Sequence, residues 1–475
     1  MRPSVPLTAL IATLSPFAKA TPPESPPGAS GASGLVTGVV KAAREESLGP
    51  VASAEAVPGP AFLHAGPMLG HVSESAAKIW VKASNKATLI LKIGRAPDLS
   101  DAKLIPGPVL DVGTEFTGVV EAGGLEAGTR YYYAPVLDGM PALARPWPSF
   151  ATPGGSRGTL RVAIGSCAGR RGYEAAASFG EMNARRGIDL LLMLGDNHYA
   201  DTTDAVKLRD HYFMQRTVHG FSFLTREVPV YAIWDDHDYG PNNSDGTLPG
   251  KATSLRIFNQ WWANSSAGEP ENPGCYFRFS RSGVDFFMLD DRYHRTPNGA
   301  PEDGKKTMLG ARQLAWLKQS LSESKAVFKV IAAGSEWQTR TQDDGWASFA
   351  REREEIFSHI RRQNLENVLF ISGDRHFTAG YQIQDRFLEL TSGPIGSRNA
   401  ALKANPELFT GNDKGKMWVV LDFDTATGTP RFSYEIQQAG GGLLERRELT
   451  MDELNGRAKI APSTLLAPAH IGKKP

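Results

Sequence analysis

Five apolar runs of strand length lie between residues 159 and 376, and each run stops at a cluster of polar residues. In chain order the clusters are "GSC", "GDNHYAD", "WDDHD", "GSEW" and "SGDRH", and a further strand-like run ends in "MLDDRYHR". Longer helix-like segments such as residues 310–323 alternate with these runs, which predicts stacked α/β layers. Ligands of α/β sheets bind outside the carboxyl ends of the strands. Strand ends of one sheet would therefore bring these side chains into a single crevice.

The cluster "DDHD" poses an electrostatic problem, because Asp235, Asp236 and Asp238 crowd around His237 at the end of an apolar run. Several carboxylates do not stay ionised side by side without a compensating charge, and divalent or trivalent cations supply it. Taken alone, each cluster has an ordinary structural interpretation, such as a Gly-Asp turn, a buried Cys or an Asx-rich turn. The occurrence of four clusters in order after strong apolar runs favours a metal site.

Composition narrows the class of protein. Lys plus Arg number 52 and Asp plus Glu number 51, so the bulk charge gives no reason to expect nucleic acid or an anionic membrane as a partner. A chain of 475 residues is too long for one ordinary core, which predicts two domains. The two cysteines, Cys167 and Cys275, are too few for a disulfide scaffold, although a single disulfide between them is an alternative to a metal role for Cys167.

The first twenty residues differ from the rest of the chain. Arg2 precedes the apolar stretch "VPLTALIATLSPFAKA", which ends in the small-x-small sequence Ala18-Lys19-Ala20. We interpret this segment as a signal peptide, with a frayed, mildly apolar N-terminus as the alternative. No later run of about 20 apolar residues follows, so no membrane span is expected. The mature protein is expected to be exported, to the periplasm or outside the cell.

The segment before the catalytic clusters contains short β-branched and aromatic stretches separated by turn residues, which predicts a small antiparallel β-sandwich. Within it, "GLEAGTRYYYAPV" resembles the corner of fibronectin type III domains, with Leu125, Thr129, Tyr131 and Tyr133 at the matching spacing. A tyrosine hydroxyl there would bond back to the backbone and fix the corner. The predicted order is a signal peptide over 1–20, a Pro/Gly/Ala/Ser-rich linker over 21–58, the sandwich over 59–153, a catalytic domain over 159–445 and a lightly packed C-terminal tail over 446–475.

The clusters are similar, in order, to the motifs of the alkaline phosphatase D family, the PhoD-like metallophosphatases. The matching segments are "GSC", "GDNHYAD", "WDDHDYGPNNSD", "MLDDRYHR" and "SGDRH", and the resemblance covers roughly residues 60–445. The wider class is the calcineurin-like metallophosphoesterases. The resemblance implies an α/β (α+β layered) sandwich of sheets flanked by helices, preceded by a small fibronectin type III-like β-sandwich.

The resemblance also implies two kinds of metal ion. Asp196 matches the carboxylate that bridges the metals. Cys167 and Tyr199 match ligands of a ferric ion in that family. Their thiolate and phenolate are strong anionic donors, which stabilise Fe³⁺. His376 would complete the ferric side.

The second metal is expected to have oxygen ligands. Asp236 and Asp374 supply them, which favours one or two Ca²⁺ ions. Asp235 is predicted to belong to the same set of metal-site carboxylates, and Glu336 either ligates Ca²⁺ or lines the pocket. A divalent pair such as Zn²⁺/Mn²⁺ is the alternative if Cys167 is not a ligand.

The catalytic residues implied by the resemblance begin with His237, which matches a histidine that stabilises phosphoryl oxygens and protonates the leaving group. Asp235 or Asp238 would orient it. His198 is predicted to contact substrate or to act as an added ligand. The guanidinium groups predicted to bind phosphate are those of Arg170, Arg292, Arg375 and Arg398. Of these, Arg375 is also predicted to be catalytic.

The function implied is an exported, metal-dependent phosphoric ester hydrolase, an alkaline phosphatase or phosphodiesterase in which a metal-activated water attacks phosphorus in line. Its expected partners are phosphate mono- or diesters, small or part of the cell envelope, and the chain is expected to act as a monomer. The alternative is a secreted Ca²⁺-dependent binding or adhesion module without catalysis. Cys167 and His376 argue against that alternative, because pure Ca²⁺ sites use oxygen ligands.

Overall fold

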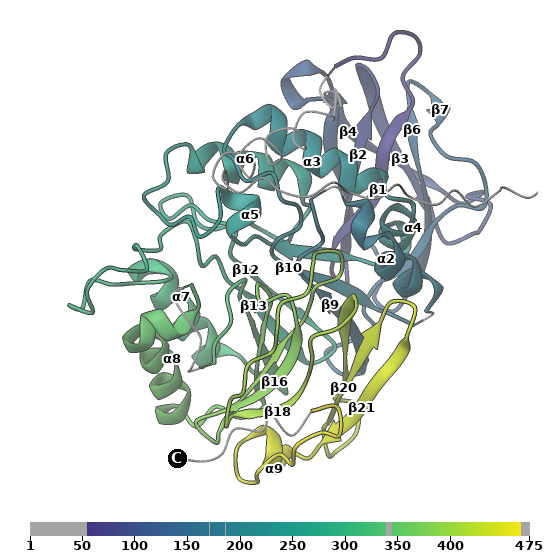
Figure 1. Cartoon of the computed structure of the whole chain (residues 1–475). Helices are drawn as coiled ribbons and strands as arrows, with labels where there is room; N and C mark the ends of the chain where they lie inside the picture. The colour runs from purple at the N-terminus through teal and green to yellow at the C-terminus, as the bar shows by residue number, and fades with distance from the viewer. Residues whose placement is uncertain (1–54, 171, 186, 339–343, 467–475) are drawn as a thin grey trace, which may run out of the picture. The chain divides into compact units, whose positions relative to one another are not determined.

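The computed structural model describes residues 55–170, 172–185, 187–338 and 344–466, which all belong to one compact unit (Figure 1). The predicted signal peptide and nearly all of the predicted linker lie outside the described residues. None of the described helices combines the length and the apolar composition that a transmembrane span requires.

The N-terminal sandwich consists of two antiparallel sheets around one apolar core. One sheet has the order β1-β2-β5, with strands Leu63–Val72, Ala76–Ala83 and Thr117–Gly123. The other has the order β4-β3-β6-β7, with strands Lys103–Leu110, Ala87–Gly94, Arg130–Leu137 and Met140–Pro141, and β8 (Ser149–Ala151) pairs with β6. The hydroxyl of Tyr131 accepts a hydrogen bond from Glu126 N at 2.9 Å, which confirms the predicted tyrosine corner.

Alternation along β2 divides its side chains between two cores. Ile79 and Val81 are buried in the sandwich core, whereas Trp80 between them belongs to the core of the catalytic domain. Trp80 Nε1 donates to Gln260 O at 2.9 Å, and its ring centroid lies 5.2 Å from that of Trp261, the last residue of α6 (Lys251–Trp261). The sandwich therefore packs directly on the catalytic layers.

Two mixed sheets form the centre of the catalytic domain. In the six-stranded sheet, β9, β10 and β11 are parallel, and the order β11-β10-β9-β19-β20-β21 runs over Val230–Ile233, Leu190–Leu194, Thr159–Gly165, Met417–Asp424, Arg431–Gln438 and Gly442–Leu449. In the seven-stranded sheet, β13, β14, β15 and β17 are parallel. Its order β12-β13-β14-β15-β17-β16-β18 runs over Phe277–Arg281, Val284–Met288, Phe328–Ala332, Val368–Ser372, Phe387–Thr391, Thr378–Ile383 and Leu408–Asn412.

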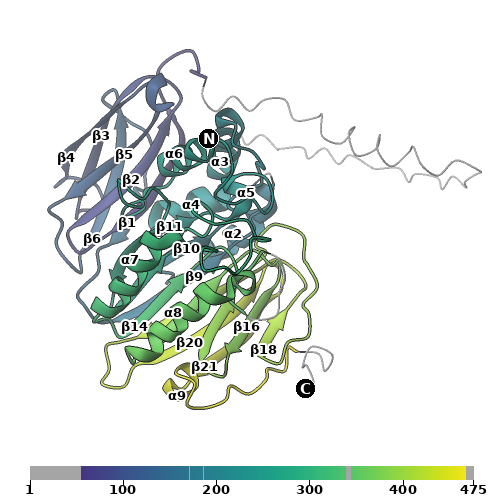
Figure 2. The same cartoon turned by 90° about the vertical axis from the view of Figure 1, so that its left-hand side faces the viewer.

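The two sheets share one core, and helices add further layers. Along β14, Val330 and Ala332 belong to the shared core, whereas Ile331 belongs to a second core that contains side chains of α7 (Gly310–Glu323) and α8 (Ala350–Arg362). Figure 2 shows α7 and α8 over the strands of this sheet. Helices α2 (Ala176–Ala184) and α4 (His219–Glu227) pack against each other, α4 also packs on β1, and both add side chains to the shared core. This arrangement confirms the predicted layered sandwich, and α7 covers the predicted segment 310–323.

The polar clusters follow strands of both sheets. Strands β9, β10 and β11 lead to Cys167, Asp196 and Asp236, whereas β14 and β15 lead to Glu336 and Asp374. The ends of the two parallel portions meet at one cavity, as predicted. The expectation that all five strands share one sheet is wrong, because alternating strand and helix patterns do not encode which sheet a strand joins.

Residues after 445 pack more closely than the predicted tail. Strand β21 runs to Leu449, α9 covers Met451–Leu454, and Leu449, Leu454 and Ile460 are buried in the shared core. The prediction of a lightly packed tail is therefore wrong for residues 446–466. The polar composition belongs instead to an edge strand, whose exposed face carries Arg and Glu side chains.

Candidate active site

The backbone is left-handed at four of the predicted metal-site residues. Cys167, Asp196, Asp374 and His376 have φ angles of 57°, 52°, 65° and 58°. A non-glycine residue in this conformation costs about 1–3 kcal/mol, so it persists only where the surrounding structure imposes it. The concentration of such residues after β9, β10 and β15 favours a functional site.

Backbone hydrogen bonds join these loops. Ala168 N donates to Asp196 O at 2.9 Å, and Gly396 N and Ser397 N both donate to Cys167 O, at 3.1 and 2.9 Å. A Cβ atom at Gly396 would lie 2.0 Å from Ala168 O, so only glycine allows this approach. Three segments far apart in the sequence are thereby held together around Cys167.

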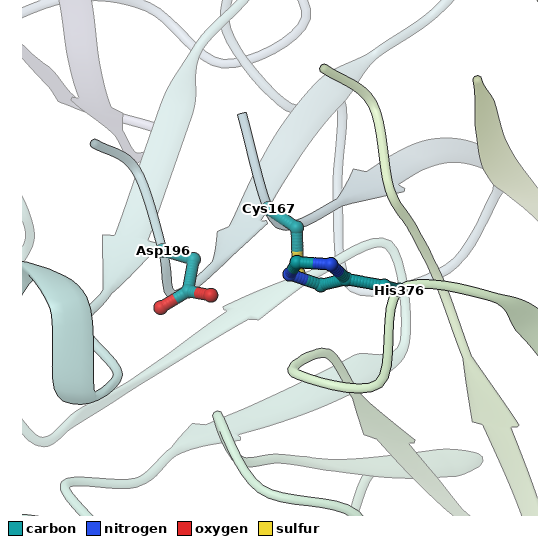
Figure 3. Close-up of side chains that lie close together, drawn as sticks. All are labelled: Cys167, Asp196 and His376. Atoms are coloured by element: carbon teal, nitrogen blue, oxygen red, sulfur yellow. The ribbon is translucent and has the colours of Figure 1, made fainter. Parts of the chain in front are cut away.

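The side chains of Cys167, Asp196 and His376 converge from three loops (Figure 3). Their donor atoms, a sulfur, a carboxylate oxygen and an imidazole nitrogen, all lie within 4.8 Å of one another. Tyr199 Oη donates to Asp196 Oδ2 at 2.8 Å and also contacts His376 Nε2 at 2.9 Å. The structure therefore brings together all four residues predicted for the ferric side.

A second group of donors shares Asp196 with the first. Ligand atoms of Asp196, Asp236 and His237 also lie within 4.8 Å of one another. Asp236 is held by backbone donors, since its Oδ1 accepts from His237 N at 2.9 Å and its Oδ2 from Asn243 N at 2.7 Å. A carboxylate common to two donor groups is the arrangement required of a residue that bridges two cations.

His237 lies in the short helix α5 (Asp236–Tyr239), and its Nδ1 is hydrogen bonded to Asp201. The prediction that Asp235 or Asp238 orients this imidazole is therefore wrong. Asp201 ends the motif "GDNHYAD", but its pairing joins the loop after β10 to the loop after β11, and no local pattern shows such a contact. In the sequence, only the position of Asp201 in this motif indicates that it belongs to the site.

The charge state of His237 follows from its neighbours. Burial by itself would lower the pKa of His237, but the hydrogen bond to Asp201 and the charges of Asp236 and Asp238 raise it above its usual value. Because Nδ1 is occupied by Asp201, Nε2 is the nitrogen available to a ligand. A protonated imidazole at this position can stabilise an anion or donate a proton.

The donor groups themselves require a cation. Burial and neighbouring negative charges raise the pKa values of the Asp196 carboxyl, the Cys167 thiol and the Tyr199 phenol well above their usual range. In addition, Asp196 Oδ1 is buried and has no hydrogen-bond partner among the described residues. A cation would satisfy that oxygen and offset the repulsion, so the residues present fit metal ions.

The two donor groups border a cavity of about 1150 Å³. The predicted residues on its wall are Arg170, Tyr199, His237, Asp374, Arg375, His376 and Arg398. Cys167, Asp196 and Asp236 are buried next to it. Other residues on the wall were not predicted from the sequence, because most of them lie outside the motifs and none carries a pattern that marks a site: Asn243, Gln338, Tyr381, Lys403, Asn405 and Lys416.

Arg292 is completely buried and does not border the cavity. Its guanidinium pairs with Asp235 at 2.5 Å and with Asp344 at 2.6 Å. Arg295 pairs with the same Asp344 at 2.9 Å. We therefore replace the predicted phosphate contact of Arg292 and the predicted metal contact of Asp235 with a buried ion-pair network behind the site.

Glu336 has a contact that the sequence did not indicate. It is completely buried, and its Oε1 pairs with Arg375 Nε at 2.8 Å. Arg375 NH1 in turn contacts Asp374 Oδ2 at 3.2 Å. Glu336 neither joins a donor group nor borders the cavity, so we correct both predicted alternatives and assign it to anchoring Arg375.

Asp238 and His198 are buried beside the site and do not border the cavity. Asp238 accepts from Asn197 Nδ2 at 2.7 Å and from His198 N at 3.3 Å. The His198 ring packs edge-on against Tyr212, with centroids 4.2 Å apart. These contacts correct the predicted catalytic role of Asp238 and substrate role of His198, because both residues hold the loop after β10 against α5.

The alternative disulfide is absent. Cys167 and Cys275 are both buried free thiols. Cys275 N donates to Asp290 Oδ2 at 2.8 Å, beside the seven-stranded sheet, whereas Cys167 follows β9 of the other sheet. The Cys167 thiol therefore remains available as a ligand.

Two facing mixed sheets, with a shared carboxylate joining two donor groups at their strand ends, define a metallophosphoesterase fold. The profile of the PhoD-like phosphatase family matches residues 162–443, more than half of the chain, so this chain belongs to that family. A second profile, a domain of unknown function (DUF7800), matches residues 60–153.

The chain is 24% identical over 366 residues to alkaline phosphatase D of Bacillus subtilis (strain 168), which covers 62% of this chain and 62% of that relative. It is 26% identical over 208 residues to tartrate-resistant acid phosphatase type 5 of Oryctolagus cuniculus, covering 40% of this chain and 59% of that protein. The chain thus matches less than two thirds of the length of each of these relatives.

Solved structures share the fold at low identity. A structure of PhoD superposes with a TM-score of 0.66 at 18% identity and covers 83% of this chain and 93% of its own. Purple acid phosphatase PPD1 from yellow lupin seeds superposes with a TM-score of 0.63 at 11% identity and covers 83% of this chain and 75% of its own.

The buried network around Arg292 generates a stability prediction. Arg292→Leu leaves the carboxylates of Asp235 and Asp344 without their partner, so we expect the free energy of unfolding to fall by about 3–5 kcal/mol. Chemical denaturation measures it, with Arg312→Leu on the surface as the control. Unchanged stability together with a raised KM for a phosphate ester would restore the phosphate-binding role of Arg292.

A second prediction concerns Glu389, which accepts hydrogen bonds from Ser372 Oγ at 2.6 Å and Trp337 N at 2.8 Å. Burial, with the nearby charge of Glu336, raises the pKa of Glu389 from 4.5 to about 8. The folded protein therefore keeps a proton that the unfolded chain releases, and this group's contribution to stability is lost as pH rises from about 5 to about 8. Glu389→Gln mimics the neutral acid, so its stability relative to the wild type should increase over that window, by on the order of 3 kcal/mol at pH 7.

Denaturation midpoints of both proteins at several pH values test this expectation. Glu126→Gln on the surface of the sandwich controls for the loss of a charge. A difference between Glu389→Gln and the wild type that does not vary with pH would show that Glu389 is ionised in the folded protein.

Proposed function

We propose that this chain is a metal-dependent phosphoric ester hydrolase that acts on phosphate mono- or diesters. The observation that carries the proposal is the carboxylate of Asp196, which two groups of donors share at the edge of one cavity. Membership of the PhoD-like phosphatase family and the likeness to alkaline phosphatase D support it.

The donor types suggest which ions bind. A sulfur, a phenol oxygen, an imidazole and a carboxylate suit Fe³⁺ in the group of Cys167, Tyr199, His376 and Asp196. The carboxylate of Asp236, with Asp374 on the cavity wall, suits one or two Ca²⁺ ions, or another divalent ion. When bound, such cations lower the pKa of a water molecule and neutralise charge on the phosphate.

The chain's own residues then position and protonate the ester. His237, which we assign to the ester and not to the second cation, binds a phosphoryl oxygen through Nε2–H and donates that proton to the leaving-group oxygen, while Asp201 keeps the ring in place at Nδ1. Arg170, which contacts Asp201 at 3.4 Å, and Arg398 offer guanidinium groups to the remaining phosphoryl oxygens. Water attacks phosphorus on the side opposite the leaving group.

The proposal extends to the setting of the enzyme. Residues 1–20 have the charge, apolar length and small-x-small ending of a signal peptide, so we propose that the protein is exported. We propose separately that it acts as a monomer. Cell-envelope phosphodiesters are candidate substrates in that compartment.

The test is hydrolysis by the metal-replete protein of a monoester and a diester, p-nitrophenyl phosphate and bis(p-nitrophenyl) phosphate. Asp196→Asn keeps the shape but removes the shared charge. We expect kcat/KM to fall by at least about 100-fold, because changes in residues that merely orient metal ligands already cost 10–100-fold. Asp98→Asn, on the exposed surface of the sandwich, is the matched control. A metal-replete wild type that hydrolyses neither ester would favour the Ca²⁺-dependent binding module.

A further inference from the structure

The wall of the cavity carries more cationic side chains than carboxylates. The cationic residues are Arg170, Arg375, Arg398, Lys403 and Lys416, and the carboxylates are Glu174, Asp201 and Asp374. An excess of positive charge in a concave site attracts anionic ligands, and low-dielectric walls strengthen that attraction.

Three of these cations have partners. Arg170 contacts Asp201 at 3.4 Å, and Arg375 pairs with Glu336 at 2.8 Å. Lys416 interacts with Glu174 and donates to the backbone of the loop after β17. Arg398 and Lys403, in contrast, form no ion pair with any carboxylate of the described residues. These two cations are therefore available to a ligand.

Arg398 lies next to the donor groups. The residue before it, Ser397, donates its N–H to Cys167 O at 2.9 Å. Two residues after it, Ala400 donates its N–H to His376 O at 3.0 Å. The segment that carries Arg398 is thus bound on both sides to loops that carry the ferric-side residues, and Arg398 borders the same cavity as Tyr199 and His376.

Lys403 lies farther along the same segment, between two anchored residues. Leu402 is buried and donates its N–H to Asp413 Oδ2 at 3.0 Å, and the buried side chain of Asn405 donates to Gln338 Oε1 at 2.9 Å. Lys403 is exposed and borders the cavity, as do Ala400, Ala401, Ala404 and Phe377. Along the chain, the cation Arg398 is followed by the small apolar residues Ala400 and Ala401 and then by the second cation, Lys403.

The size of the cavity agrees with a ligand that reaches both cations. Its volume of about 1150 Å³ slightly exceeds the 300–1,000 Å³ that sites for drug-sized molecules occupy and is well beyond the need of a single phosphate group. The Cα atoms of Arg398 and Lys403 are five residues apart, so they lie at most about 18 Å from each other.

We propose that residues 398–403 form a second anion subsite, and that the preferred substrates are phosphate esters whose leaving group carries a second phosphate. The scissile phosphate lies at the donor groups and Arg398, the linking carbon atoms lie along the alanines, and the second phosphate binds Lys403. This inference rests on the proposed hydrolase function and specifies its substrate class.

The experiment compares bisphosphates with monophosphates of the same α,ω-alkanediols, over spacers of about three to ten carbon atoms, which span the distances that five residues allow. The readout is kcat/KM from phosphate release by the metal-replete protein. At the best spacer we expect the bisphosphate to be preferred by about tenfold or more, because a charge-assisted contact exceeds the factor of about two that a second scissile group supplies.

In Lys403→Gln, kcat/KM for the bisphosphate should be within about threefold of kcat/KM for the monophosphate, because the substitution removes the charge and keeps a polar side chain. Lys414→Gln alters an exposed lysine that does not border the cavity, and it should preserve the preference. A preference that survives Lys403→Gln would overturn the assignment of the subsite.

The outcomes separate this inference from the function on which it rests. Hydrolysis of the monophosphates without a preference for any bisphosphate would overturn the second subsite and leave the hydrolase proposal in place. A metal-replete protein that releases phosphate from neither series would overturn both.

Discussion

The site is governed by the repulsion among several buried carboxylates that follow two neighbouring strands, and by the positive charges that neutralise them. Asp196, Asp235, Asp236 and Asp238 lie close enough that burial and mutual repulsion raise the pKa of Asp196 well above its usual range. The chain compensates only part of this charge itself, through the pair of Asp235 with Arg292 and through the imidazole of His237 beside Asp236. The remainder, centred on Asp196, needs cations, and that need sets the chemistry of the site.

The fold makes this concentration of charge possible by packing two mixed sheets face to face. Their parallel portions end at one cavity, and the loops that follow turn through left-handed residues such as Cys167 and His376. The strain of these turns is offset by the large shared core, to which the sandwich contributes Trp80. A rigid framework of this kind holds ligand atoms in place before any ion binds, which reduces the ordering cost of binding.

Much of the fold and part of the site follow from the sequence. Local patterns predict the strand-length apolar runs and the helix over 310–323. The order of the motifs predicts the ferric-side residues Cys167, Asp196, Tyr199 and His376. Contacts between segments that are distant in the sequence cannot be predicted from such local patterns. The pairing of His237 with Asp201, the burial of Arg292 and the place of Lys403 on the cavity wall depend on which loops meet, and a single sequence does not encode that locally.

We propose that Cys167, Asp196, Tyr199 and His376 hold a ferric ion beside a second cation bound by the carboxylates of Asp196 and Asp236. The most direct test is metal analysis together with an absorption spectrum of the mature protein purified without chelator. We expect iron and calcium, with a visible charge-transfer band that is lost in Tyr199→Phe or Cys167→Ser. A colourless, iron-free protein that still hydrolyses phosphate esters would contradict it, because the same fold would then use a different metal pair and Cys167 would have no role as a ligand.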